Sequence, residues 1–313
     1  MSALPKPFIS LGRGTLVEQQ QELERIALDG IGFNRLSALL KELTGIFLED
    51  NSKNRSLMVS RVVQTMRNRE MGSLSDYFNL LRSARADSEE IAEFVSKMTT
   101  NTTRFFRESA HFKQLQGVIP TILAEKEKMH GVDSSEIRVW CAASSTGQEP
   151  YTLAMVMLEE LARVAPQKPW RLKILASDID RPSLHKAVSG IYLQQEIESV
   201  PPELLRKYFV ERVDGAAGKR FMVHPSLGKK ITYAEINLTA QPYPMQRLFD
   251  VIFCRNVLIY FNRQTAEQVV SNLERVLRPG GYLFLGHSES GSMRNTKFQT
   301  ISHAVYRKKG DLK

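Results

Sequence analysis

The 313-residue sequence contains no long hydrophobic run. A helix needs about 20 mainly apolar residues to cross a bilayer, and no segment approaches that length. The first twenty residues, MSALPKPFISLGRGTLVEQQ, also lack the apolar stretch of a secretory signal peptide. These absences argue against an integral membrane protein or a secreted one, and we expect the chain to stay in the cytoplasm.

Cysteine is nearly absent as well, and internal repeats and low-complexity tracts are missing. The two cysteines, Cys141 and Cys254, each lie within an apolar, β-rich run rather than in a C-x-x-C spacing. Neither a zinc site nor a redox pair is indicated. We therefore interpret both as small buried hydrophobic residues and predict no metal site.

Basic residues exceed acidic ones, giving a formal net charge of +9 and an isoelectric point near 9.5. Such a charge favours an acidic partner. Nucleic acid, an anionic membrane and an acidic protein surface all meet that description, so charge alone does not choose among them.

The first hundred residues show helical periodicity and no convincing strand. Apolar residues recur at helical spacing in two segments: Phe33, Leu36, Leu39, Leu40, Leu43 and Phe47, and then Met58, Val59, Val62, Val63 and Met66. Two shorter helices are expected over 74–85 and 88–98. The pattern predicts an N-terminal tail (1–28) followed by an all-helical domain (29–100).

The remainder, 101–313, is expected to form an α/β domain. From residue 137, short apolar runs alternate with helical patterns, which is typical of βαβ units and a parallel sheet. The expected strands are IRVWCAA, LKILASD, ITYAEIN, FDVIFCR and GYLFLGH. One segment, 190–230, breaks the alternation, because KYFVERV and KRFMVHP flank a Gly-containing loop as in a hairpin. We interpret it as a small antiparallel β insertion.

The loop after the first expected strand, AASSTGQE, is acidic and is not a glycine-rich fingerprint. A dinucleotide places its pyrophosphate at such a helix N-terminus, where the carboxylate of Glu149 would repel it. The same carboxylate would attract a ligand that carries an ammonium and a sulfonium group. The loop therefore favours S-adenosylmethionine over NAD, although an acid in a first helical turn can also simply complement the helix dipole.

A second acid, Asp178, ends the second expected strand in LASDID. Nucleoside sites place an acid here, where it accepts hydrogen bonds from two ribose hydroxyls. Asp180 is a competing candidate, and a turn-capping role is the alternative for both. We favour Asp178 because it follows the strand directly.

Six segments in order resemble the motifs of the CheR family of chemotaxis receptor methyltransferases: MTTNTTRFFRE, RVWCAASSTGQEPYTLAM, LASDID, INL, FDVIFCRNVLIYF and RPGGYLFLGHSES. The resemblance extends from Phe33 to Arg307. It implies a doubly wound, Rossmann-like S-adenosylmethionine methyltransferase domain, an N-terminal all-helical domain and a small antiparallel β insertion. Where the family commonly has a second acid beside Glu149, this sequence has Gln148.

The resemblance also implies the residues of the site. Those expected to contact the cofactor are Asn101, Thr103, Arg107, Glu149, Asp178, Asn237, Leu238, Cys254 and Arg255. The first three would cover the cofactor, Glu149 would meet its polar groups, and Asp178 would bind the ribose. Asn237 and Leu238 would flank the adenine, and Cys254 and Arg255 would contribute largely through their backbone.

The expected chemistry needs positioning more than a base. A glutamate acceptor has a reference pKa near 4.3 and is already ionised at neutral pH. A guanidinium fork orients a planar carboxylate, so Arg107 and Arg255 are candidate clamps, and Tyr260 can add a neutral hydrogen bond. Either arginine could instead form an internal ion pair, and Tyr260 could be a half-buried sheet residue. We interpret His287 as structural rather than as a base.

The predicted function is methyl transfer from S-adenosyl-L-methionine, which leaves S-adenosyl-L-homocysteine, to glutamates on the cytoplasmic domains of chemotaxis receptors. The β insertion is one candidate receptor contact. The other is a basic stretch formed by Lys53, Arg55, Arg61, Arg67 and Arg69. We predict no nucleic-acid partner and no membrane insertion.

Two alternatives stay open. A nucleic-acid methyltransferase fits the charge, but it would need an Asn-Pro-Pro-Tyr type of motif where this chain has CRNVLIY after the fourth expected strand. A non-catalytic adaptor could keep the fold to sense S-adenosylmethionine. The intact Glu149, Asp178, Arg107 and Tyr260 argue against that adaptor.

Overall fold

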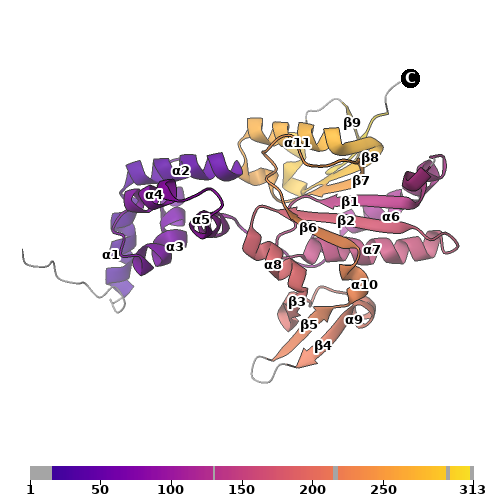
Figure 1. The fold of residues 1–313 in the computed structure, drawn as a ribbon, viewed down its shortest axis with the longest axis horizontal. Coiled ribbons are helices and arrows are strands. Elements are labelled where there is room, and N and C mark those ends of the chain that lie inside the picture. The colour runs from indigo at the N-terminus through magenta and orange to yellow at the C-terminus, as the bar shows by residue number, and fades with distance from the viewer. Residues whose placement is uncertain (1–15, 130, 214–217, 294–296, 311–313) are drawn as a thin grey trace, which may run out of the picture. The chain divides into compact units, whose positions relative to one another are not determined.

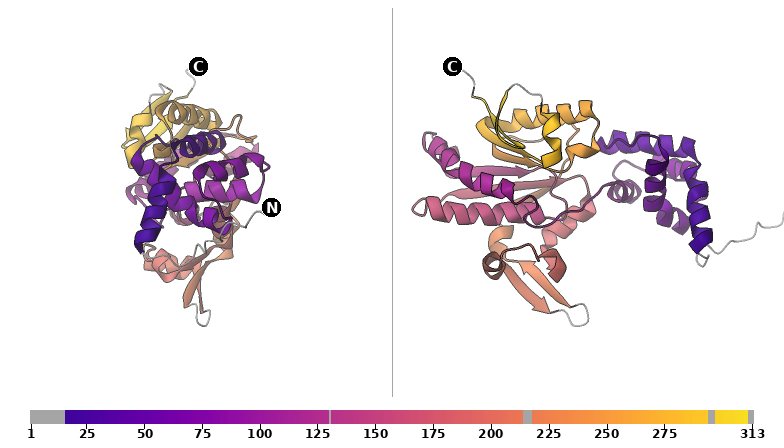
Figure 2. Two further views of the ribbon diagram at one scale, coloured as in Figure 1. Left: turned by 90° about the vertical axis from the view of Figure 1, so that its left-hand side faces the viewer. Right: turned by 180° about the vertical axis from the view of Figure 1, so that it is seen from behind.

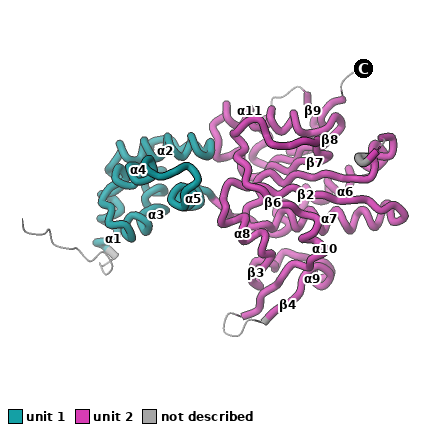
Figure 3. Tube along the Cα trace, in the orientation of Figure 1, with its two compact units in different colours: residues 1–99 teal, residues 100–313 magenta. Residues whose placement is uncertain are grey.

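The computed structural model of the chain describes residues 16–129, 131–213, 218–293 and 297–310 (Figure 1). The chain divides into two compact units, residues 1–99 and residues 100–313 (Figure 3). Among the described helices, none combines the length and the hydrophobicity that a bilayer crossing requires.

The first unit is all-helical in its described part. It contains α1 (Leu16–Ala27), α2 (Gly30–Thr44), α3 (Ser52–Asn68), α4 (Leu74–Ser83) and α5 (Glu89–Met98). The predicted apolar positions of α2 and α3 form its core, with Phe33, Leu36, Leu40, Met58, Val62 and Met66 fully buried. The predicted all-helical domain is confirmed.

Polar residues set where these helices begin. The side chains of Asp29, Asn51, Ser73 and Ser88 each accept a hydrogen bond from a backbone N–H in the first turn of α2, α3, α4 and α5. Such caps satisfy amides that have no partner within the helix. The starts of four helices are therefore determined by a capping residue next to each start.

The prediction that residues 1–28 form a tail is wrong over residues 16–27, which form α1. The helix is joined to α3 by an ion pair between Arg67 Nη2 and Glu22 Oε2 at 2.5 Å, and Ile26 is buried. Its sequence, LVEQQQELERIA, offers few apolar residues to reveal a period. Tertiary contacts rather than a strong local pattern support this helix.

The predicted basic stretch is largely engaged inside the helical unit. Arg55 pairs with Asp50 at 2.5 Å, and Arg69 lies 3.7 Å from Glu90. Arg61 Nη1 donates to the carbonyls of three residues at the end of α5: Lys97 (3.2 Å), Met98 (2.7 Å) and Thr99 (3.0 Å). These carbonyls belong to the last turn of a helix, where a cation is favoured. The stretch thus serves the fold of this unit.

The second unit is built on a seven-stranded sheet. Its strands are β1 (Glu136–Cys141), β2 (Arg171–Asp178), β6 (Ile231–Glu235), β7 (Phe249–Cys254), β8 (Leu277–Leu285), β9 (Phe298–Ser302) and β10 (Val305–Lys308). The order is β6-β2-β1-β7-β8-β10-β9. The first five in that order are parallel, and β10 runs antiparallel to both its neighbours. The predicted doubly wound α/β fold is confirmed.

Helices cover both faces of the sheet, as Figure 2 shows. Helices α6 (Ala110–Glu127) and α7 (Gln148–Val164) pack against one side of β1, which presents Ile137, Val139 and Cys141. Helix α11 (Arg263–Val276) covers the other side, where Trp140 and Ala142 lie. Side chains alternate along a strand, and the buried run of β1 feeds two separate cores. The two cysteines are fully buried, as predicted.

A second, three-stranded sheet is inserted in the chain between β2 and β6. It contains β3 (Ile191–Leu193), β5 (Lys219–Val223) and β4 (Phe209–Val213), all antiparallel in that order. In the chain, α8 (Arg181–Ser189) precedes this sheet, α9 (Pro202–Tyr208) lies between β3 and β4, and α10 (Pro225–Gly228) follows it. Strands β4 and β5 form the predicted hairpin, and residues 214–217 of its loop lie outside the described residues.

The strand order fixes where a ligand can bind. From β1 the chain adds β2 and β6 on one side and then β7 and β8 on the other, and the order therefore reverses between β1 and β7. In open α/β sheets, ligands bind beside the carboxyl ends of the strands at such a reversal. A ligand site is therefore expected at the loops that follow β1, β2, β6 and β7.

The contact of Arg61 with the end of α5 yields a prediction. Arg61→Ala should lower the hydrogen-exchange protection of the α5 amides by about 1 to 2 kcal/mol, because charge-assisted hydrogen bonds to three carbonyls are lost. The exposed Lys53→Ala in the first turn of α3 is the control and should change it little. Equal protection in both variants would contradict a capping role.

Candidate functional site

The loop between β1 and α7 has a backbone that few residues tolerate. Gly147 ends it with φ +97°. A Cβ there would lie 2.7 Å from the Tyr192 hydroxyl and 2.9 Å from Ala187 Cβ. Ser145 also has a positive φ of +46°. The glycine lets the chain turn sharply into α7, which places Glu149 in the first turn of that helix as predicted.

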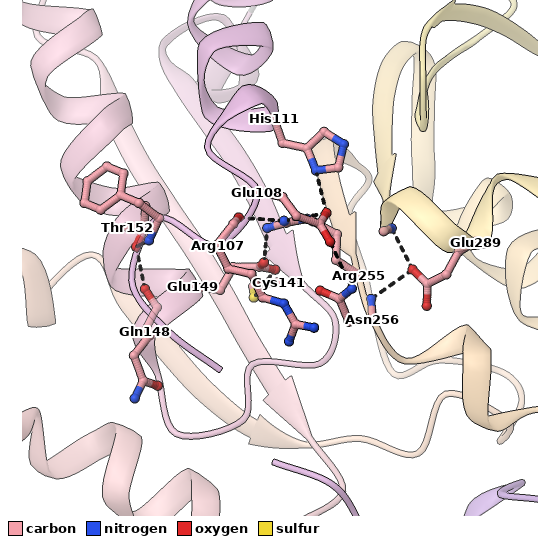
Figure 4. A network of polar contacts seen from close by, with 12 residues as sticks. Arg107, Glu108, His111, Cys141, Gln148, Glu149, Thr152, Arg255, Asn256 and Glu289 are labelled. Carbon is pink, nitrogen blue, oxygen red and sulfur yellow. Dashed lines mark hydrogen bonds and ion pairs between the residues drawn. The ribbon is translucent and has the colours of Figure 1, made fainter. Parts of the chain in front are cut away.

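Arg255, the residue after β7, is buried in an ion-pair network (Figure 4). Its Nη1 donates to Glu149 Oε2 at 2.5 Å, and its Nη2 donates to Glu108 Oε2 at 2.9 Å and to the Arg107 carbonyl at 2.7 Å. The guanidinium also lies over the Phe112 ring, 5.6 Å from its centroid. Of the two alternatives open for Arg255, the structure shows the internal ion pair.

Glu149 is held from both sides. Besides Arg255, the Cys141 thiol donates to Glu149 Oε1 at 3.3 Å. Burial raises the pKa of that thiol well above its usual value, and Glu149 raises it further. Cys141 is therefore a neutral donor to Glu149, and among the described residues the ion-pair partner of Glu149 is Arg255.

Asp178, at the end of β2, joins the loops that follow β1 and β2. Its Oδ2 accepts the Ser145 N–H at 2.7 Å, and its Oδ1 accepts the Asp180 N–H at 3.0 Å. Burial raises the pKa of this carboxyl, against these hydrogen bonds. A carboxylate also has lone pairs beyond these two, so Asp178 can still accept hydrogen bonds from a ligand.

Asp180, the competing candidate, has a different surrounding. It is buried, and its Oδ2 accepts from Asn101 Nδ2 and from Ser183 Oγ at 2.6 Å. The Asn101 carbonyl in turn accepts from Ser145 Oγ at 3.0 Å. Asn101 thus ties the loop after β2, through Asp180, to the loop after β1, through Ser145, while Asp178 is the less enclosed acid of the two.

The other predicted site residues lie at the carboxyl ends of β6 and β7 or on the segment before α6. Asn237 and Leu238 follow β6, where Asn237 Oδ1 accepts from the Thr239 N–H at 2.9 Å and the Leu238 carbonyl accepts from the Tyr243 hydroxyl at 2.7 Å. Cys254 is the last residue of β7 and is fully buried. Thr103 is half-buried on the segment before α6.

Arg107 and Tyr260, the other predicted catalytic residues, are both half-buried. Arg107 Nη1 donates to the Thr102 carbonyl at 2.8 Å, and no carboxylate pairs with Arg107 among the residues that the structure describes. Tyr260 ends a short 3-10 turn, Leu258–Tyr260, rather than lying in the sheet. The two residues thus differ from Arg255, whose charge is already balanced by acids.

Sequence reasoning missed two acids that build this site. Glu108 shares Arg255 with Glu149, and its Oε1 accepts from Asn256 Nδ2 at 3.2 Å. Glu289, within the GHSES motif, accepts the N–H groups of Gly286 (2.6 Å), Leu258 (2.7 Å) and Asn256 (2.9 Å). Burial raises its pKa. Their positions inside two of the six motifs were the available signal, but nothing local distinguished them from surface acids.

Comparison with known proteins identifies the family of the chain. The family model described as "CheR methyltransferase, SAM binding domain" matches residues 101–307, and "CheR methyltransferase, all-alpha domain" matches residues 31–99. The chain is 37% identical to a chemotaxis protein methyltransferase of Escherichia coli K12, covering 91% of this chain and 93% of that protein. It is 35% identical to one of Salmonella typhimurium LT2, covering 95% and 96%. A probable chemotaxis protein methyltransferase of Rhizobium etli is 38% identical, covering 84% and 94%.

The network around Arg255 predicts a pH dependence. Burial opposes ionisation of Glu108, but hydrogen bonds from Arg255 and Asn256 outweigh it and lower the pKa to about 2 from 4.5. A carboxyl whose pKa is lower in the folded state contributes stability above its unfolded pKa, and the contribution is lost as pH falls towards the folded pKa. The stability advantage of wild type over Glu108→Gln should therefore shrink steadily as pH falls from 4.5 towards 2. Chemical denaturation at a series of pH values measures it, and a constant difference would contradict the assignment.

Proposed function

Since the chain belongs to the CheR methyltransferase family, we propose that it transfers methyl groups from S-adenosylmethionine to glutamate side chains of chemotaxis receptors. Family membership confirms the resemblance predicted from the six motifs. The chain is accordingly an S-adenosylmethionine-dependent methyltransferase. The acceptor group and the site residues are the proposal.

One observation carries the proposal. A single sheet edge combines acids suited to a cationic cofactor with an arginine, Arg107, that no described acid neutralises. Such an arginine suits an anionic acceptor such as a carboxylate. The arrangement therefore supports a carboxylate acceptor.

The donor and acceptor groups fit S-adenosylmethionine, which supplies an electrophilic methyl group on a sulfonium. Glu149 presents a carboxylate at a position where a pyrophosphate would be repelled. Asp180 Oδ1 is buried without a hydrogen-bond partner in the described residues, which marks an unused acceptor beside Asp178. An acid in the first turn of α7 and acids at and after the end of β2 thus supply what an ammonium and a ribose require.

We assign the cofactor contacts accordingly. Asp178 accepts from the ribose, and Glu149 faces the ammonium while Arg255 fixes its orientation. The remaining contacts are those implied at the same edge: Asn101, Thr103 and Arg107 over the cofactor, Asn237 and Leu238 beside the adenine, and the backbone at Cys254.

Arg107 is the acceptor clamp in this proposal, and Arg255 is a positioning residue. Arg255 already pairs with two carboxylates, so a third would meet a neutralised guanidinium. Arg107 is fixed by a neutral carbonyl and keeps its full charge. Tyr260 adds one neutral hydrogen bond, which orients the acceptor oxygen without removing its nucleophilicity. No base is needed, because the acceptor is ionised already.

Most residues of the predicted basic stretch are already paired within the protein, so they are less available for a receptor than the sequence suggested. Arg55, Arg61, Arg67 and Arg69 have partners within the helical unit, and Lys53 is the exposed cation of the set. We propose that cytoplasmic receptor domains meet this protein through the helical unit, with Lys53 among the contacts, and through the small β sheet. The Arg61 and Arg67 side chains contribute by holding that unit together.

The ribose assignment is tested by Asp178→Asn, which keeps an oxygen for the Ser145 amide but removes the charge. Affinity for S-adenosylhomocysteine should fall about tenfold or more, since hydrogen bonds to a charged group contribute roughly 1.5 to 3 kcal/mol. Glu235→Gln, at the end of neighbouring β6, is the matched control and should bind normally. Calorimetry measures both, and wild-type affinity in Asp178→Asn would remove the assignment.

The activity is tested with labelled S-adenosylmethionine and receptor cytoplasmic fragments. We expect base-labile methyl groups on receptor glutamates, and none on DNA or RNA. Arg107→Ala should lower kcat at least about 100-fold and Tyr260→Phe about tenfold, with smaller effects on cofactor affinity, because both act on the acceptor in the transition state. Base-stable labelling, or labelled nucleic acid, would support the alternative acceptor. Cofactor binding with no labelled receptor would support the non-catalytic adaptor.

A further inference from the structure

A cluster of three ligand-type side chains lies beside the Arg255 network. Glu108, His111 and His287 each offer one ligand atom, and these atoms lie within 4.8 Å of one another. They come from three places: the segment before α6, the first turn of α6, and the turn His287–Ser292 after β8. The imidazole rings of His111 and His287 meet edge to face, with centroids 4.6 Å apart.

His111 is the unusual member of this cluster. Its side chain is fully buried, and neither ring nitrogen has a hydrogen-bond partner in the described residues. A buried polar atom without a partner costs about 1 to 3 kcal/mol and calls for an explanation such as a missing ion. His111 is therefore a buried ring whose nitrogens are unused by other described residues, and one of them faces Glu108.

The spacing fits a metal better than a hydrogen bond. His111 Nδ1 lies 3.4 Å from Glu108 Oε2, and Figure 4 shows the ring facing that carboxylate. Two ligands about 2.0 to 2.1 Å from a tetrahedral zinc ion lie about 3.4 Å apart. His287 is exposed, so it can close on an ion and leave a path by which the ion enters.

We propose that Glu108, His111 and His287 bind a divalent transition-metal ion, of the class that prefers two imidazoles and a carboxylate. Zinc is the reference case for this ligand set. The sequence predicted no metal, because residues 108 and 287 are far apart in the chain and no spacing signals their approach.

The proposed ion acts on the cofactor site through Glu108. Glu108 Oε2 also accepts from Arg255, and Arg255 holds Glu149. An ion that draws charge from Glu108 leaves Arg255 more dependent on Glu149, and Glu149 then has less charge for a cationic ligand. The charge of the ion acts in the same direction. Metal binding therefore weakens binding of S-adenosylmethionine, and by linkage the cofactor weakens metal binding equally.

The metal site is tested by titrating Co²⁺ into the chelator-treated full chain. We expect one equivalent to give the strong visible absorption of four- or five-coordinate cobalt, with Zn²⁺ displacing it. His287→Ala, an exposed position, and His111→Asn should each weaken binding at least about tenfold, since a ligand bond is lost. His185→Ala, an exposed histidine on α8, is the control and should leave it unchanged.

Absence of binding, or equal binding in both ligand variants and wild type, would overturn the site. This titration needs no methyltransferase activity, so its failure is separate from a failure of the proposed function. The link to the cofactor is tested by calorimetry with S-adenosylmethionine, where one equivalent of Zn²⁺ should reduce affinity about fivefold or more. An unchanged affinity with the metal bound would keep the site and refute the link.

Discussion

The buried guanidinium of Arg255 is the interaction on which the site depends. It joins three parts of the chain that are distant in sequence: the end of β7, the first turn of α7 through Glu149, and the segment before α6 through Glu108. A buried charge is tolerated only when it is paired and hydrogen-bonded, and removal of one partner typically costs about 3 to 5 kcal/mol. The three segments are therefore held in one arrangement at the carboxyl ends of the parallel strands, where we propose that the cofactor binds.

The need to pair the buried charge of Arg255 also accounts for the strained backbones of the neighbouring loops. Phe106, Glu108 and Asn256 have positive φ values, which place the side chains of Glu108 and Asn256 against each other. Glu289 offsets part of this strain, because its carboxylate accepts three backbone N–H groups around Asn256. Strained residues of this kind persist only where the surroundings over-determine them, and they gather at functional sites.

Much of the fold could be predicted from the sequence, because it is expressed locally. The apolar period of α2 and α3, the buried runs of the sheet strands and the caps at Asn51 and Ser73 all act within a few residues. Helices α1 and α6 were not predicted. Helix α1 has few apolar residues, and Gly117 and Pro120 interrupt the pattern of α6. Both helices depend on packing contacts that the spacing of apolar residues in the sequence does not reveal.

The site was less predictable for a related reason. The motifs placed Asp178 and Arg255 at the ends of strands and Glu149 after the loop that follows β1, and the strand order brings these segments together. Which acid pairs with which arginine depends on contacts across more than one hundred residues, such as Arg255 with Glu149. Sequence reasoning therefore treated Arg107 and Arg255 as equivalent clamps. The structure distinguishes them, because Arg255 is paired with two carboxylates and Arg107 donates to a neutral carbonyl.

That separation has a consequence for the whole reaction cycle. A glutamate acceptor is an anion, but its methyl ester is neutral. An arginine whose hydrogen bond among the described residues goes to the neutral Thr102 carbonyl attracts the anion strongly and the ester weakly, since the attraction depends on the opposite charge. An arginine already paired with acids would make little distinction between them. The proposed clamp at Arg107 thus binds the acceptor before transfer and loses its hold afterwards, so the same contact that orients the substrate also favours release of the product.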